Sequence, residues 1–303
     1  MVAGGPIDAR NQEIAWAQID YYTAFSQATL SPSVSPESMG NKQSRGKSKG
    51  SDGGGAAADP PAAPPAAGGS DEKYELVYFP VMRKGLGPAL CMHLSGLSWD
   101  GPGSMGRNML EEWPAVKETG VSPFGQMPLL KTPASDGGFY VSQTTAVANF
   151  IAHKVGPSFA GEGKDYAVSQ MLIAEGEDLH DMLGKFVPSF KAALGEDGKS
   201  ADIAVYHRYW AEVLPPHLAK LEALLDDEAR FTSGAGSHRW LVGEVQLFAY
   251  LHQNALVKPD VLSSTPKLDR WYKDVLEDPK IQEALAGNSP FGKFKQYFIA
   301  PEE

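Results

Sequence analysis

The chain has 303 residues, enough for one large domain or two small ones, and 42% of them are hydrophobic, which is ample for a packed core. A formal net charge of -10 argues against nucleic acid as a general partner. A single cysteine, Cys91, excludes a disulfide framework within the chain and suits a reducing compartment such as the cytoplasm.

Residues 1–72 differ in composition from the rest of the chain. From Ser51 to Ser70 they are almost entirely Gly, Ala, Pro, Ser and Asp. Such a segment cannot bury enough apolar surface to offset the entropy lost on ordering. We therefore predict a disordered, low-complexity N-terminal extension over residues 1–72, within which Ile7 to Leu30 is rich enough in aromatic residues for a short helix.

A possible acylation motif lies inside this extension. The segment Met39-Gly-Asn-Lys-Gln-Ser44 matches the N-myristoylation pattern, but only if translation starts at Met39 so that Gly40 carries the acyl group. A chance match in a solvated tail is the alternative, and we favour it because the motif is internal as numbered. Elsewhere no apolar run approaches the length of a membrane span, and the first residues lack the pattern of a secretory signal.

From Lys73 the sequence alternates between strand and helix patterns. Branched and aromatic residues bounded by Gly and Pro predict short strands, and apolar spacing after Pro88 or Gln143 predicts helices. The predicted elements are strands over Tyr74–Phe79, Met127–Leu130 and Phe139–Val141, with helices over Ala89–Leu97 and Thr144–Val155. This order indicates a small α/β domain over residues 73–156.

Beyond Lys164 the strand patterns fade and helical spacing of apolar residues takes over. Helices are expected around Met171–Phe186, Tyr206–Leu225, Trp240–Leu256, Lys267–Leu276 and Pro279–Leu285. Pro215-Pro216 interrupts the second of these and should kink it, because proline removes a helical hydrogen bond. The sequence therefore predicts an all-helical domain over residues 164–298.

Three motifs lie in series in the α/β part: Trp113-Pro-Ala-Val-Lys117, Phe124-Gly-Gln-Met-Pro128 and Gln143-Thr144. They supply an aromatic ring, a cation, a main-chain edge before a proline and a polar pair at a helix start, which together suit a small, charged, peptide-like ligand. Together with Tyr74–Phe79 they resemble the glutathione-binding half of a glutathione S-transferase, closest to the sigma class and the haematopoietic prostaglandin D synthase group. The resemblance implies a thioredoxin-like N-terminal α/β domain followed by an all-α C-terminal domain, the glutathione transferase fold.

The resemblance identifies Tyr78 as the catalytic residue, whose hydroxyl would donate to the glutathione sulfur. A free thiol has a pKa of ~8.5, so little of it is thiolate at neutral pH. A donated hydrogen bond favours the charged form, and a shift of ~2 units amounts to about 3 kcal/mol. Taken alone, Tyr78 is better explained as a packing residue of a strand.

The resemblance also implies a set of glutathione-binding residues. The main chain before a cis Pro128 would pair with the cysteinyl part, and the Gln143-Thr144 pair would bind the γ-glutamyl end, although it also suits a plain helix cap. Trp113 and Lys117 would contact the glycine end. The expected binding residues are Arg83, Trp113, Lys117, Gln126, Met127, Pro128, Gln143, Thr144 and Asp181.

Two of these assignments leave alternatives open. The family carries an arginine that supports the tyrosine, and here either Arg83 or Lys84 could take that role, because the segment has one extra residue. Asp181 resembles an acidic residue that reaches the glutathione of a neighbouring subunit, which implies a homodimer with two composite sites. An exposed helix carboxylate is the other interpretation of Asp181.

The chain departs from the family after Leu241-Val-Gly, where a buried Asp that caps a helix is replaced by the run Glu244-Val-Gln. Loss of such a cap costs ~1 kcal/mol, so we expect a less stable helix there.

The site for a small hydrophobic electrophile is expected to draw on residues 79–83 and on helix residues such as Met182, Phe186 and Tyr209. The sequence shows no metal-ligand spacing and no cofactor motif; glutathione is expected as a co-substrate.

Two functions remain on the sequence alone. The first is a glutathione transferase that uses Tyr78 to activate the thiol. The second is a non-catalytic binding or scaffold module with the same fold. Retention of Tyr78, Gln126-Met-Pro128 and Gln143 favours the enzyme, because a scaffold does not need them.

Overall fold

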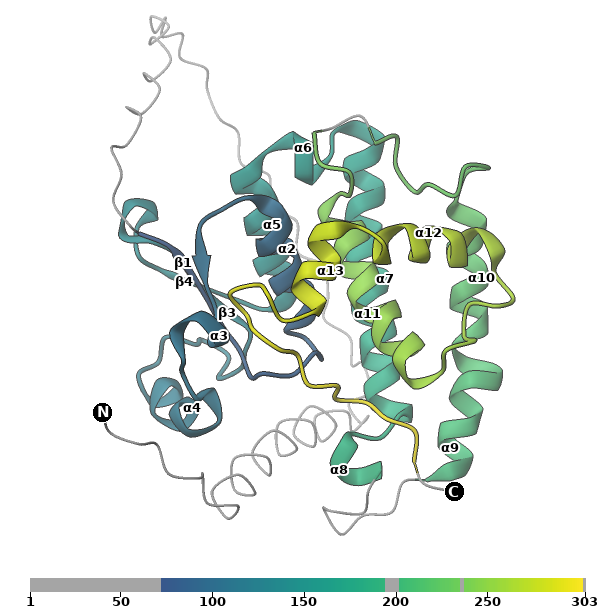
Figure 1. Ribbon diagram of the computed structural model, residues 1–303, viewed down its shortest axis with the longest axis horizontal. Helices are drawn as coiled ribbons and strands as arrows, with labels where there is room; N and C mark the ends of the chain where they lie inside the picture. The colour runs from purple at the N-terminus through teal and green to yellow at the C-terminus, as the bar shows by residue number, and fades with distance from the viewer. Residues whose placement is uncertain (1–71, 194–201, 235–236, 302–303) are drawn as a thin grey trace, which may run out of the picture. The chain divides into compact units, whose positions relative to one another are not determined.

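The computed structural model describes residues 72–193, 202–234 and 237–301, all of which belong to one compact unit of the chain (Figure 1). Apart from Glu72, the predicted disordered extension lies outside the described residues. So do the possible helix over Ile7–Leu30 and the conditional acylation of Gly40. The predicted domain limits stay a prediction.

A four-stranded mixed sheet with the order β2-β1-β3-β4 forms the first part. β1 pairs parallel with β2 and antiparallel with β3, and β3 pairs antiparallel with β4. The strands are β1 Tyr74–Val77, β2 Trp99–Asp100, β3 Leu129–Lys131 and β4 Tyr140–Ser142. The three predicted strands are confirmed: β1 is shorter than predicted, while β3 and β4 end one residue later than predicted. Strand β2 was missed because two residues give no alternating pattern.

Helices alternate with these strands along the chain. They are α2 Leu86–Ser95, α3 Pro102–Met105, α4 Met109–Glu118 and α5 Thr144–Val155, with a 3-10 turn η1 over Ala134–Asp136. Helix α2 begins three residues earlier than predicted and ends at Gly96, whose φ of 75° suits a residue without a side chain. Helix α4 was missed. Its start carries a recognisable signal, since the Asn108 side chain accepts from the Leu110 N–H at 3.2 Å.

The second part is all helical, as predicted. Its elements are α6 Pro157–Ala160, α7 Gly163–Phe186, α8 Phe190–Ala193, α9 Ile203–Arg208, a π-helical turn η2 Tyr209–Val213, α10 Pro215–Leu224, α11 Val242–Val257, α12 Pro266–Leu276 and α13 Pro279–Leu285. The predicted interruption at Pro215-Pro216 is confirmed: the α9 helix widens into the π-helical turn and α10 starts at Pro215. A thioredoxin-like α/β part is thus followed by an all-α part.

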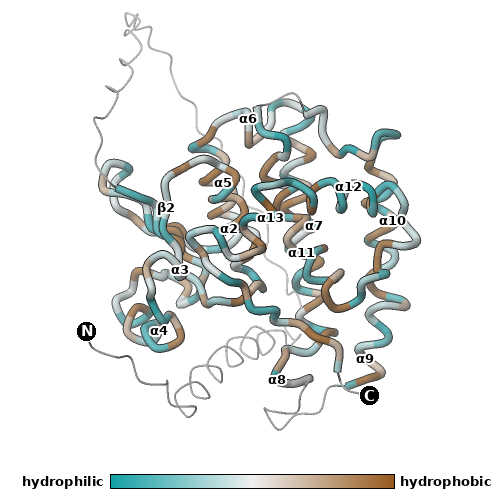
Figure 2. The backbone as a smooth tube through the Cα atoms, in the orientation of Figure 1, coloured by the Kyte–Doolittle hydropathy of each residue, from teal (hydrophilic) through white to brown (hydrophobic). Residues whose placement is uncertain are grey.

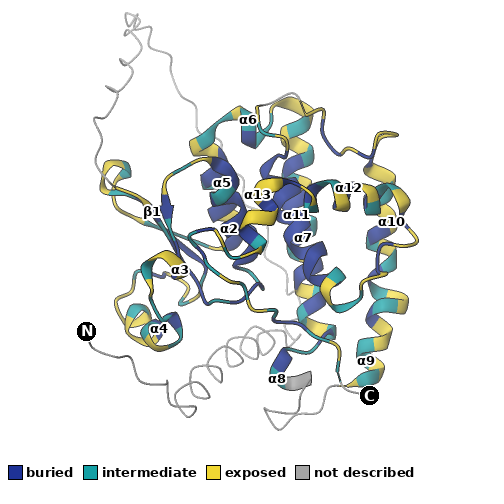
Figure 3. Ribbon diagram, viewed as in Figure 1, coloured by how far each residue is buried: buried dark blue, intermediate teal, exposed yellow. Residues whose placement is uncertain are grey.

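Helix α11 is the central element of the helical part. It is buried from Val242 to Asn254, as Figure 3 shows, and packs against α7 and α2. Its Gln246 side chain lies so close to Gly87 that a Cβ there would come within 2.3 Å of the amide oxygen. By contrast, α12 is largely hydrophilic and buries only the face with Leu268, Trp271, Tyr272 and Val275 (Figure 2). Helices α2 and α5 lie between the sheet and the helical part (Figure 1).

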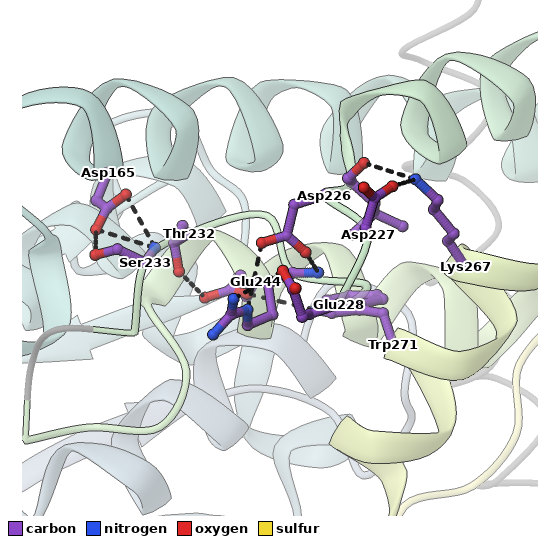
Figure 4. Close-up of polar contacts among 11 residues, drawn as sticks. Asp165, Asp226, Asp227, Glu228, Thr232, Ser233, Glu244, Lys267 and Trp271 are labelled. Atoms are coloured by element: carbon purple, nitrogen blue, oxygen red, sulfur yellow. Dashed lines mark hydrogen bonds and ion pairs between the residues drawn. The ribbon is translucent and has the colours of Figure 1, made fainter.

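The start of α11 corrects the expectation of a lost helix cap. Glu244 is 2% exposed, and its carboxylate accepts from the Leu241 main-chain N–H and the Thr232 hydroxyl, both at 3.0 Å. The Trp271 indole N–H lies 3.4 Å away (Figure 4). Burial raises the pKa of Glu244, and these donors oppose that effect. The longer side chain therefore caps the helix from its third residue, in place of the missing Asp.

We predict that Glu244→Ala lowers the free energy of unfolding by about 3 kcal/mol, because buried donors lose their acceptor. Urea unfolding of the full chain measures this. The matched control is Glu228→Ala, an exposed carboxylate on the preceding loop, which should change stability by less than about 0.5 kcal/mol. Equal effects of the two substitutions would contradict the capping role.

Candidate functional site

The strand register brings three of the sequence-predicted residues to one end of the sheet. Val77 pairs with Leu129, and Leu129 pairs with Ser142. One step further along this register, Tyr78 lies beside Pro128, and Gln143 lies on the other side of Pro128. Residues far apart in the sequence are therefore adjacent where the strands end.

Tyr78, Pro128 and Gln143 form a row at this end of the sheet, and the main chain before Pro128 is an open edge within it. The Met127–Pro128 peptide is cis, as the family resemblance implies. The Gln126 main chain is tied to Ser122, whose hydroxyl accepts from the Gln126 N–H at 2.9 Å and donates to its carbonyl at 2.8 Å. Within the described part of the chain, the main-chain N–H and C=O of Met127 form no hydrogen bond. An extended peptide can pair with such an edge.

Gln143 completes this edge from the neighbouring strand. Its side-chain amide donates to the Gln126 side-chain oxygen at 3.5 Å, and both side chains are exposed. Its backbone has φ 77° and ψ 129°, in a region that residues other than glycine rarely adopt. Backbone strain of this kind is concentrated at functional sites.

Tyr78 follows β1 directly and is 3% exposed. Its hydroxyl oxygen accepts from the Lys84 main-chain N–H at 3.2 Å, and none of the described residues accepts the Tyr78 proton. Only glycine fits at position 85, since a Cβ there would lie 2.2 Å from the Tyr78 ring. Burial raises the pKa of Tyr78, while the Arg83 charge and the Lys84 N–H oppose this. The phenol is therefore protonated at neutral pH and has a proton to donate.

Arg83 and Lys84, the two candidates for one supporting role, contribute in different ways. Arg83 supplies a positive charge near Tyr78, and its guanidinium lies 5.2 Å from the centre of the Tyr297 ring. Lys84 supplies the main-chain N–H, and its ammonium pairs with Glu177 at 2.7 Å and Asp181 at 3.6 Å. Both residues therefore act on Tyr78, one through charge and the other through a hydrogen bond.

Helix α4 carries Trp113 and Lys117. Trp113 is 2% exposed, so most of its ring packs inside the α/β part. Lys117 is exposed and runs along the loop before Gln126, because a Cβ at Gly125 would lie 2.9 Å from its Cε. The cation thus lies beside Gly125, two residues before Met127, while the buried Trp113 lies on the same helix.

Thr144, the first residue of α5, is 3% exposed. Its side chain opposes the rise in pKa that burial causes at Tyr250, which lies on the side of the helical part. Its side chain therefore takes part in the contact between α5 and α11. The main-chain N–H groups at the start of α5 remain the part of the helix that favours an anion.

Three polar residues of the helical part complete the surroundings of Tyr78 and were not singled out from the sequence. Glu177 on α7 accepts from the Tyr250 hydroxyl at 2.6 Å, in addition to its ion pair with Lys84. Gln253 on α11 donates to the Arg83 carbonyl at 2.9 Å. The spacing of Glu177 and Asp181, one helical turn apart, was the signal available in the sequence.

Asp181 has an exposed side chain, and its pKa is about 2, lowered by the neighbouring His180 ring and by the Lys84 charge. His180 itself is buried between the rings of Tyr250 and Phe298. Neither of its ring nitrogens has a hydrogen-bond partner among the described residues, and Asp181 Oδ1 lies 3.5 Å from Nδ1. Burial lowers the pKa of His180 to about 4, so this ring is neutral.

A C-terminal strap, residues 295–299, crosses beside this site. Lys295 donates to the Pro80 carbonyl and accepts from the Met82 N–H, both at 2.9 Å, and Tyr297 accepts from the Phe190 N–H at 2.7 Å. Tyr297 and Phe298 are each 3% exposed. The strap therefore joins the loop after β1 to the start of α8.

The residues expected around an electrophile are only partly available. Tyr209 is fully buried, stacks on Phe186 and donates its hydroxyl to Asn254 at 2.7 Å. It therefore belongs to the packing between η2 and α11. Of the residues after β1, Pro80 and Met82 form hydrogen bonds with Lys295 of the C-terminal strap.

Sequence comparison adds little. A family model described as "Protein of unknown function (DUF3720)" matches residues 22–84, less than half of the chain. No curated protein matches the chain in sequence. Within the described residues, no three His, Cys, Asp or Glu side chains come together as a metal site, and no helix is long and apolar enough to cross a membrane.

The structure, by contrast, is similar to many solved ones. A glutathione S-transferase from Ascaris lumbricoides is 23% identical, with a TM-score of 0.55 over 71% of this chain and 96% of that one. A prostaglandin synthase D from Nilaparvata lugens is 19% identical, with a TM-score of 0.54 over 72% and 99%. A glutathione transferase family member from Pseudomonas fluorescens pf-5, solved with two glutathione bound, is 15% identical, with a TM-score of 0.55 over 71% and 93%.

These similarities define the class of fold. The chain has the glutathione transferase fold, with its α/β part and helical part in the expected order. At this level of identity they do not distinguish the sigma class from other classes.

We predict that His180 makes stability depend on pH. Its folded-state pKa of about 4 lies below the unfolded value of ~6.5, so stability is lost as pH falls from about 6.5 towards 4, by up to about 3 kcal/mol. His180→Leu removes this titration and should flatten the decline, measured by urea unfolding at several pH values. The control, the exposed His207→Leu on α9, should keep the wild-type profile; a decline unchanged by His180→Leu would contradict the prediction.

Proposed function

We propose that the protein is a glutathione transferase that activates the glutathione thiol through Tyr78. The observation that carries the proposal is the Tyr78 hydroxyl, which accepts one hydrogen bond from Lys84 while no described residue takes its proton. A buried donor without an acceptor is costly unless a ligand supplies one. A sulfur atom beside the end of β1 would be that acceptor.

In the proposed reaction the Tyr78 O–H donates to the sulfur and favours the thiolate, whose proton leaves to solvent. The Arg83 charge adds to this effect. The thiolate then attacks the electrophile, forms the S–C bond and displaces the leaving group. Tyr78 does not lose its proton in this reaction, which agrees with its raised pKa.

The tripeptide would bind along the open edge of the sheet. Its cysteinyl part pairs with the Met127 main chain, its γ-glutamyl end lies at Gln143 and the start of α5, and its glycine carboxylate lies near Lys117. Thr144 contributes its main-chain N–H in this arrangement. A glutathione complex has been solved for the Pseudomonas fluorescens protein of the same fold.

A homodimer belongs to the same proposal, since Asp181 has an exposed side chain on α7 and would reach the glutathione of a second copy. Light scattering on the full chain would test the homodimer.

A sigma-like class, a small hydrophobic electrophile and a cytoplasmic location are further parts of the proposal that follow from the sequence resemblance. Cys91 is fully buried, and burial raises the pKa of its thiol to about 12.

A non-catalytic binding or scaffold module is the alternative. Burial of Tyr209 and the strap beside the loop after β1 favour it, because both reduce the surface open to an electrophile. Retention on immobilised glutathione followed by an assay with chlorodinitrobenzene distinguishes the two. A scaffold would show no turnover in that assay.

We predict that Tyr78→Phe keeps binding to immobilised glutathione and lowers turnover of chlorodinitrobenzene about 25-fold at pH 7, because a thiol pKa that rises from ~6.5 to ~8.5 lowers the ionised fraction of the sulfur from about three quarters to about 3%. The matched control is Tyr74→Phe on the same strand, which removes a hydroxyl bonded to Asp136. That control should cost about 1 kcal/mol of stability and leave turnover unchanged. Unchanged turnover in Tyr78→Phe would reject Tyr78 as the activating donor.

We predict that Gln143→Gly separates stability from binding. Glycine relieves the strain of a φ of 77°, worth about 1–3 kcal/mol, and costs about 0.5–1 kcal/mol in entropy, so stability should stay the same or rise. The Kd for glutathione should rise about tenfold as the amide is lost. The control, Thr145→Gly in the exposed first turn of α5, should lower stability by about 0.3 kcal/mol and leave binding unchanged. Unaltered glutathione affinity in Gln143→Gly would remove Gln143 from the site.

A further inference from the structure

We propose that Glu177 on α7 is a positioning residue for Tyr78, which acts by holding Lys84 so that its main-chain N–H stays on the Tyr78 hydroxyl. The inference rests on the proposed function for its chemical consequence. Its structural part, the link from Glu177 to Tyr78, stands on the geometry alone.

The link consists of three consecutive hydrogen bonds across the two parts of the molecule. Tyr250 on α11 donates to Glu177 at 2.6 Å, Lys84 Nζ pairs with the other Glu177 oxygen at 2.7 Å, and the Lys84 N–H donates to Tyr78 at 3.2 Å. The Lys84 and Glu177 side chains are 29% and 22% exposed, so the pair is more shielded than an ordinary surface ion pair. Glu177 is therefore fixed on one side and holds Lys84 on the other.

The loop that carries Lys84 needs such support. Arg83 has a φ of 25°, which is unfavourable for a residue with a side chain. Strained backbone persists only where its surroundings hold it. Here the Gln253 amide holds the Arg83 carbonyl, the strap holds Met82, and Glu177 holds Lys84. Of these contacts, only the one from Glu177 reaches the residue that bonds to Tyr78, and it is shorter than the second ion pair of Lys84, with Asp181 at 3.6 Å.

Orientation of the phenol follows from this contact. An N–H on the Tyr78 oxygen occupies one acceptor direction and leaves the proton to point elsewhere. If Lys84 moves, the hydroxyl loses that restraint, and its hydrogen bond to a bound sulfur weakens. The thiol pKa then rises.

Charge alone predicts the opposite sign. Glu177 raises the pKa of Tyr78 through its negative charge, and it would do the same to a nearby thiol. Its removal would therefore lower the thiol pKa if charge were its only role. The direction of the change in the thiol pKa therefore separates positioning from electrostatics. Removal of a residue that only stabilises the fold would leave the thiol pKa unchanged.

The test compares Glu177→Gln with Glu175→Gln in the full chain. Glutamine keeps an acceptor for Tyr250 and removes the ion pair with Lys84. Glu175 is the matched control, since it lies on the same helix, has a similar exposure and pairs with His217 at 2.6 Å. Four quantities are measured: hydrogen exchange of the Lys84 amide by NMR without ligand, the pKa of bound glutathione from thiolate absorbance, and the kcat and KM of turnover.

We expect Glu177→Gln to speed Lys84 amide exchange about tenfold and to raise the thiol pKa by about one unit, with about tenfold lower kcat below that pKa and little change in KM. Glu175→Gln should leave all four unchanged. Tyr78→Phe should also speed the exchange, because the amide loses its acceptor. Exchange unchanged in Glu177→Gln, or a lowered thiol pKa, would overturn the inference. If the wild type binds no glutathione, the proposed function fails, while the exchange comparison still decides the positioning role.

Discussion

The hydrogen bond from the Lys84 main chain to the Tyr78 hydroxyl is the interaction on which the proposed chemistry depends. It fixes the oxygen of a buried phenol and leaves the proton uncommitted among the described residues. The ring needs the space that Gly85 leaves, and the loop needs Arg83 in an unfavourable backbone conformation. Neither condition is favourable for the loop by itself. Both are met because the helical part of the molecule holds the loop in place.

The two parts of the molecule therefore have separate tasks. The α/β part offers a row of residues at the end of its sheet, with the Met127 main chain and Gln143 beside Tyr78. The helical part supplies the restraints, through α7, α11 and the C-terminal strap. The close approach of Gln246 to Gly87 shows how tightly the two parts are packed. A change in the contact between the two parts would therefore alter the hydrogen bond from Lys84 to Tyr78 more than it altered the edge of the sheet.

Much of the fold and of this row could be predicted from the sequence, because motif spacing and strand patterns are local. Helix α4 was missed, since Pro114 within it obscures the helical pattern. Glu244 was misjudged because its longer side chain caps the helix from a different position, which only packing shows. Glu177 was passed over in favour of Asp181, since a sequence does not show which carboxylate on one helix face meets a lysine far along the chain.

The most direct test is the ionisation of glutathione bound to the wild-type chain, followed by thiolate absorbance as pH is raised. If Tyr78 donates to the sulfur, the bound thiol should ionise with a pKa about two units below the ~8.5 of a free thiol. A bound thiol that titrates at the same pH as in buffer would contradict the central claim, even if glutathione binds well.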